Sequence, residues 1–192
     1  MSRSLVTSNS ANALFQNVNA TNVAGNSIYS VNVAGSHLNP GLQKLVMNCL
    51  QEIEDGRLKD TFIEQLGHFN RLPTHRNLKT KLATAGCSDD YYDFAIEAKE
   101  GFAKFFEIAA RHPSGQAILV SAFKHAYSLF SEKVRPILST ITFADQAAIF
   151  ESEVVGYLSH NLTGLPEFYG RMEALGLIYF LADNCFIEYA NC

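Results

Sequence analysis

Histidine and cysteine are the residue types in this chain best suited to binding a metal or moving a proton. The candidates are His37, His68, His75, His112, His125 and His160, with Cys49, Cys87, Cys185 and Cys192. No histidine pair has the helical spacing that places two imidazoles on one face, and no HExxH motif occurs. No two cysteines form a CxxC pair. His125 falls on an apolar stripe between Ala122 and Leu129, which favours a packed side chain over a ligand. We therefore expect no metal site.

Other catalytic signatures are also missing from the sequence. It contains no GxSxG nucleophile motif and no glycine-rich phosphate-binding loop. Asp89 and Asp90 would suit acid–base chemistry, but their place before an apolar periodic segment is better explained as the acidic start of a helix. The sequence therefore predicts a protein that is not an enzyme and needs no cofactor. The alternative interpretation is a helical enzyme that uses a metal or a cofactor at His125 or near Cys87.

The elements that would have to position any such site are helices that follow residue 38. Asn39 before Pro40 is a typical helix start, and Ser88 and Thr142 are further candidates for N-caps. Apolar residues then recur with helical spacing. We expect helices over residues 40–56, 58–69, 76–85, 89–112, 114–134, 143–158 and 167–182, then a short extended segment over 185–189. The predicted fold class is mainly α, with six or seven helices in a domain over residues 39–192.

Residues 1–38 form a separate, low-charge segment that repeats about every five residues. Its aliphatic positions are Val18, Val23, Ile28 and Val33, each preceded by Asn or Ser. This period fits neither a helix nor a strand, and it is typical of β-solenoid coils that bury their aliphatic residues by stacking on another coil. We therefore expect a β-like arm that forms a homo-oligomer through these side chains. A hairpin that turns at Gly25-Asn26 and an irregular segment are the alternatives.

Composition argues against several classes of function. The net charge of −4 and the pI of about 5.8 argue against nucleic-acid binding, which needs a basic surface. No apolar run is long enough to cross a membrane, and none forms a secretory signal. The cysteines are expected to stay reduced, so we expect a cytoplasmic protein. A polar, charge-poor N-terminus also suits export, and a secreted bacterial effector is therefore a further alternative.

The longest predicted helix, over residues 89–112, carries charged residues on the side opposite its apolar face. These residues are Glu97, Lys99, Glu100 and Lys104. Such a charged stripe on a helix most often faces solvent. It is therefore the candidate partner-binding face of the helical domain.

Five segments of the helical part carry a recognisable pattern, at residues 77–86, 93–104, 127–130, 134–137 and 178–187. Together they resemble the C-terminal domains of the ABC-three-component (ABC-3C) conflict systems of prokaryotes. The resemblance implies a non-enzymatic scaffold or adaptor in antiviral (anti-phage) defence, which assembles with itself and couples to an ABC-type ATPase or an effector component. Asp183 and Phe186 stand where that family usually has a glycine and a histidine around its terminal Asn-Cys pair.

Overall fold

The computed structural model describes residues 38–59, 64–69 and 77–189, all of which lie in the unit Val33–Cys192. The elements are α2 (Pro40–Glu54), α3 (Glu64–Phe69), α4 (Leu78–Thr84), α5 (Asp89–Ala109), α6 (Pro113–Leu129), η1 (Phe130–Val134), η2 (Arg135–Ile137), α7 (Phe143–Phe150), η3 (Glu151–Val155), α8 (Gly156–Asn161) and α9 (Arg171–Asp183). Because α6 continues into η1, and α7, η3 and α8 form one rod, these residues make seven helices and no strand. The prediction of a mainly α domain is confirmed.

The β-like arm predicted for residues 1–38 lies almost entirely outside the described residues, and so do Val18, Val23, Ile28 and Val33. Its β structure and its role in assembly therefore stay predictions.

Side-chain caps fix where four of the helices begin. The cap residues are Asn39, Asn77, Ser88 and Thr142, and each accepts a hydrogen bond from a backbone amide in the first turn. At α7 the Thr142 amide and hydroxyl in turn donate to Asp145, which lowers the pKa of that carboxyl. The predicted caps at Asn39, Ser88 and Thr142 are confirmed.

Two of the helices contain a π-helical turn that the apolar periodicity does not predict. The turns are η1, which extends α6, and η3, which joins α7 to α8. A π turn holds one residue more than an α turn, so it changes the angle at which later side chains leave the helix. In η3 the adjacent residues Val154 and Val155 are both buried. The helix predicted over 143–158 is therefore one rod in the structure, with a change of register in its middle.

Two predicted helix starts and the predicted conformation of one segment are wrong. Leu58 does not begin a helix; it lies in coil with 65% of its surface exposed. The last helix begins at Arg171 instead of 167, because Glu167 and Gly170 have φ angles of 58° and 129°, which a helix cannot contain. The segment 185–189 is a coil, and the φ of 62° at Cys185 breaks the extended conformation that we expected there.

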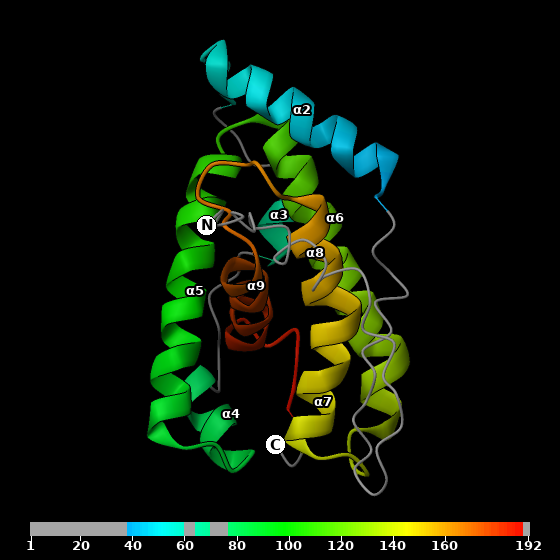
Figure 1. Cartoon of the computed structure of the whole chain (residues 1–192). Coiled ribbons are helices and arrows are strands. Elements are labelled where there is room, and N and C mark those ends of the chain that lie inside the picture. The colour runs from blue at the N-terminus through cyan, green and yellow to red at the C-terminus, as the bar shows by residue number, and fades with distance from the viewer. Residues whose placement is uncertain (1–37, 60–63, 70–76, 190–192) are drawn as a thin grey trace, which may run out of the picture. The chain divides into compact units, whose positions relative to one another are not determined.

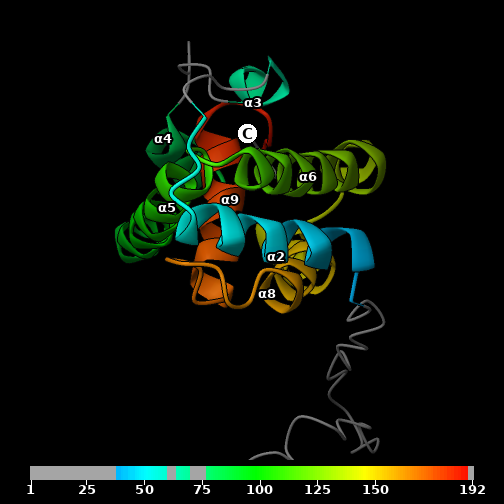
Figure 2. The ribbon, with the colours of Figure 1, turned by 90° about the horizontal axis from the view of Figure 1, so that it is seen from above.

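Helix α9 lies at the centre of the helical unit, between α5 on one side and the α7–α8 rod on the other (Figure 1). Its most extensive contact is with α5. Helix α2 lies across one end of the unit, over α6 and α8 (Figure 2). Phenylalanine fills much of the interior. Phe102, Phe105, Phe123 and Phe168 are buried in the core, and the partly buried Phe106 and Phe180 pack against them. The Phe123 and Phe180 rings stack at 5.5 Å, which joins α6 to α9.

Helices α5 and α9 approach so closely that one position must be glycine. A Cβ atom built on Gly176 would lie 2.0 Å from the Ala98 carbonyl oxygen and 2.7 Å from the Phe102 Cβ. Real Cβ atoms do not come so near a backbone oxygen. Gly101, on α5, is not crowded in this way, since its Cβ would lie 3.5 Å from the nearest atom of Glu173.

A buried carboxylate joins α2 to the start of α6. The Ser114 amide and hydroxyl donate to the two Glu52 carboxylate oxygens at 2.9 and 2.8 Å. A negative charge at a helix N-terminus is favourable because the free amides there carry partial positive charge. Burial, helped by the Glu52 charge, raises the pKa of the neighbouring Cys49 thiol to about 11. Cys49 therefore stays protonated at neutral pH and packs as a small apolar side chain.

Candidate functional site

A cavity of about 160 Å³ lies between α5, the α7–η3 segment, α9 and the C-terminal tail. Most of its lining is aromatic or aliphatic. The lining residues are Tyr91, Phe94, Phe143, Gln146, Ala147, Phe150, Glu151, Arg171, Leu175, Ile178, Tyr179 and Tyr189. Protein interiors are usually packed without spaces of this size, so a cavity with aromatic walls and a few polar groups is the default candidate for a binding site.

Two tyrosines form the polar part of the cavity wall. The hydroxyl oxygens of Tyr91 and Tyr179 lie 2.8 Å apart, so one hydroxyl donates to the other. Burial raises the pKa of both phenols, and for Tyr179 the hydrogen bond with Tyr91 raises it further. Both groups therefore stay neutral at physiological pH. They can donate or accept a hydrogen bond, but they do not supply a phenolate.

An ion pair borders the cavity on its exposed side. The Arg171 Nε and Nη2 atoms donate to the two oxygens of Glu151 at 2.7 and 3.1 Å. The arginine begins α9, and the glutamate begins the π turn η3. Because each charge is neutralised by the other, this border adds little net field to the cavity.

The C-terminal tail supplies the fourth wall. The Gln146 side-chain amide, buried on α7, donates to the Glu188 carbonyl oxygen at 2.7 Å. The next residue, Tyr189, is buried, and its ring meets the Phe143 ring edge-on at 5.2 Å. The tail is thus held against α7 by its backbone and by an aromatic contact.

A second polar cluster joins α4, α5 and α9. Asp183 accepts from the Leu78 amide at 2.9 Å, which caps α4, and from the Lys99 ammonium at 2.7 Å. The buried Lys81 ammonium donates to the carbonyl of Ala182, in the last turn of α9, and lies 3.4 Å from the Cys185 sulfur. A cation near a helix C-terminus and an anion near an N-terminus are both favourable. The cluster therefore joins the start of α4 and the end of α9 to the middle of α5.

The structure places the predicted partner-binding residues on two sides of α5. Glu97, Glu100 and Lys104 are exposed along its outer face. Lys99 turns the other way, where its ammonium is paired with Asp183 and its side chain is 26% exposed. The candidate face is therefore a stripe of three of the four residues, and whether it binds a partner stays a prediction.

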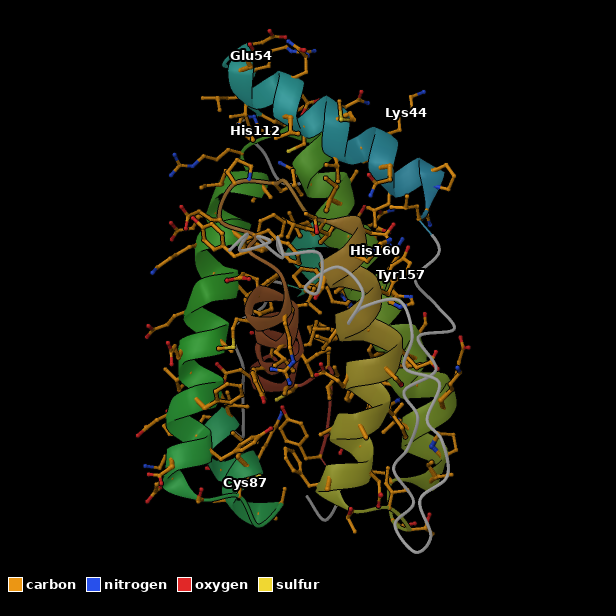
Figure 3. All side chains as sticks on the ribbon, viewed as in Figure 1. Lys44, Glu54, Cys87, His112, Tyr157 and His160 are labelled. Carbon is orange, nitrogen blue, oxygen red and sulfur yellow. The ribbon has the colours of Figure 1, made fainter. Side chains whose placement is uncertain are left out.

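The histidine and cysteine candidates are dispersed rather than gathered. The His125 Nε2–H donates to the Glu153 carbonyl at 2.9 Å, and its ring packs on Tyr157 at 4.5 Å, so this histidine packs between two helices as expected. Cys87 lies near one end of the helical unit, and His112 lies near the other (Figure 3). Within the described ranges, no three His, Cys, Asp or Glu residues are grouped so that they could hold a metal ion.

Sequence reasoning did not find the cavity. The signal that was available is the number of tyrosine and phenylalanine residues near the ends of three predicted segments, at Tyr91, Phe143 and Tyr189. Their spacing along the chain gives no indication that they meet, because the tertiary packing of α5, α7 and the C-terminal tail brings them together.

The comparisons with known proteins place most of the helical unit in a described family. Residues 77–189 match the family model CTD9, which is C-terminal domain 9 of the ABC-three component (ABC-3C) systems. No curated protein and no solved structure matches the chain. The match covers α4 to α9, and with them every wall of the cavity and the cluster around Asp183.

Proposed function

The chain belongs to the CTD9 family of the ABC-three component systems, and from this premise we propose that it is a non-enzymatic scaffold or adaptor in prokaryotic antiviral defence. In this role it assembles with itself in the bacterial cytoplasm and couples to an ABC-type ATPase or an effector component of the same system. The buried free thiol of Cys49 suits a reducing compartment. In the described part of the chain no helix is long and apolar enough to span a membrane.

The observation that carries this proposal is the outer face of α5. Its exposed stripe extends beyond Glu97, Glu100 and Lys104 to Asp93 and Glu107, at successive helical turns. The stripe is predominantly acidic, and among the described residues Glu97 and Glu100 have no ion-pair partner. A partner with a basic surface would find complementary charge along the whole helix, which speeds encounter and sets orientation.

The contacts of the buried Glu52 and Lys81 and of the half-buried Asp183 also support a binding role over a catalytic one. Glu52 is bonded to the start of α6, Asp183 to the start of α4, and Lys81 to the last turn of α9. Each of these charges stabilises a helix end, where it is fixed by several bonds. They contribute to a rigid support for the α5 face.

The partner-binding face is tested by charge reversal. We expect the double variant Glu97→Lys with Glu100→Lys to lose at least about tenfold in co-purification with the ATPase or effector component, because like charges then meet a basic partner. Both components are expressed with the tagged full chain, and the captured amounts are compared by quantitative mass spectrometry.

The control makes the same change in net charge elsewhere, with Glu54→Lys on α2 and Glu132→Lys on η1, both exposed positions. We expect this control to capture its partner as the natural sequence does. If the natural sequence captures neither component, the coupling proposal is wrong. If both double variants lose the partner equally, the α5 face is not the binding surface.

Self-assembly through the arm has its own test. We expect Val23→Asp with Ile28→Asp to lower the oligomer order while the helical unit stays folded, because burying a charge between stacked coils is costly. Light scattering gives the solution mass and circular dichroism reports the helices. A chain that starts at Ser36 should form an oligomer with the same smaller number of subunits. An unchanged number of subunits in both would contradict assembly through Val18, Val23, Ile28 and Val33.

A further inference from the structure

We propose that the cavity between α5, α7, α9 and the C-terminal tail binds a neutral, single-ring aromatic group. The ring belongs either to a small molecule or to a tyrosine-like side chain of a peptide. This site lies on the inner side of α5, so it is separate from the exposed stripe that we assign to a protein partner. Binding at one can therefore be tested without the other.

The volume of the cavity limits the ligand to a single ring. Its volume of about 160 Å³ is close to that of cavities that accept benzene, for which about 150 Å³ is sufficient. Two fused rings would fit only if the walls moved or if one ring projected through the opening. On three sides these walls are helices, and α9 is held so closely to α5 at Gly176 that it has little freedom to shift.

The lining selects an aromatic group. The Tyr91 and Phe143 rings meet edge-on at 5.4 Å, and the Phe143 and Tyr189 rings do so at 5.2 Å. Such an arrangement presents both ring edges and ring faces, which are the surfaces that another aromatic ring prefers to contact. Leu175 and Ile178 of α9 complete an apolar wall.

The charges of the lining residues favour a neutral ligand over a charged one. The charged side chains in the lining, Arg171 and Glu151, are paired with each other through two hydrogen bonds. The phenols of Tyr91 and Tyr179 are also neutral, because burial raises the pKa of each. A charged ligand would lose its hydration without gaining an opposite charge. A neutral ligand with a hydroxyl group can still form a hydrogen bond with the tyrosine hydroxyls.

The test uses p-cresol as a neutral probe and 4-methylbenzoate as its charged analogue, each titrated into the full chain and followed by two-dimensional NMR. We expect p-cresol to bind with a dissociation constant of about 1 mM or lower and to shift resonances of the lining residues. The benzoate should bind at least about tenfold more weakly. No p-cresol binding, or equal binding of the two probes, would overturn the proposal.

Filling the cavity provides the matched pair of variants. Ala147 lines the cavity, and Ala148, the next residue on α7, is exposed. We expect Ala147→Leu to abolish p-cresol binding and Ala148→Leu to keep it, with both helical by circular dichroism. Leu175→Phe fills the cavity from α9 and should also abolish binding, which keeps the test valid if one variant is poorly folded. Binding that survives in a folded Ala147→Leu or Leu175→Phe variant places the probe elsewhere and overturns the proposal.

A tyrosine amide distinguishes the two sources of the ring. N-acetyl-tyrosinamide carries the same phenol on a peptide-like backbone. If it competes with p-cresol, the opening beside Arg171 admits a side chain of a peptide. If p-cresol binds and the amide does not, the site accepts a free small molecule. Either result supports an aromatic-ring site, and each identifies the source.

Discussion

Gly176→Ala is expected to lower the free energy of unfolding of the helical unit by about 3 kcal/mol. The added Cβ would lie 2.0 Å from the Ala98 carbonyl oxygen, which is main-chain and cannot rotate away as a side chain can. Helices α5 and α9 must then separate along the most extensive helix contact of the unit. Urea unfolding followed by circular dichroism measures the change, as a shift of the midpoint at constant slope.

Gly101→Ala is the matched control, because it makes the same substitution on the α5 side of the same contact. Its Cβ would lie 3.5 Å from the Glu173 Oε1, which is an ordinary contact distance. Alanine also favours a helix over glycine by about 1 kcal/mol. We expect this variant to be as stable as the natural sequence or slightly more stable. If the two variants are destabilised equally, α5 and α9 do not approach as closely as the structure indicates.

The helices could be predicted because the signals that define them are local. Asn39 before Pro40, Ser88 before Asp89, and Thr142 with Asp145 each act within one turn. The apolar periodicity does not predict the π turns, because the contacts that stabilise them are not local. An extra residue in η3 is stable only because it packs Val154 and Val155 together against other helices, and those helices are distant in the sequence.

The candidate site could be predicted only in part, for a similar reason. The exposed stripe on α5 follows from the helical spacing of Glu97, Glu100 and Lys104. The same spacing does not indicate that Lys99 pairs with Asp183, which lies 84 residues away along the chain. The cavity likewise needs Tyr91 and Tyr179, which are 88 residues apart. Contacts of this kind depend on how the helices cross, and a single sequence does not specify that crossing.

The family match leaves out α2, which is joined to the start of α6 by the hydrogen bonds from Ser114 to Glu52. Glu52→Ala is expected to lower the free energy of unfolding by roughly 2–3 kcal/mol, because the Ser114 amide and hydroxyl would lose their acceptor in a buried position. The α6 N-terminus would also lose its compensating negative charge. Glu52→Gln keeps one oxygen acceptor, so we expect it to lose less than the alanine variant.

Glu54→Ala is the control, since Glu54 lies on the same helix and is exposed (Figure 3). We expect it to change the free energy of unfolding by less than about 0.5 kcal/mol. The segment after α2 is bonded to the same place, because the His112 imidazole donates to the Arg57 carbonyl at 2.8 Å. If α2 is an integral part of the fold, Glu52→Ala should shift the single cooperative transition of the whole unit. A separate early transition, with the main one unmoved, would mean that residues 77–189 fold on their own and that α2 is an addition to them.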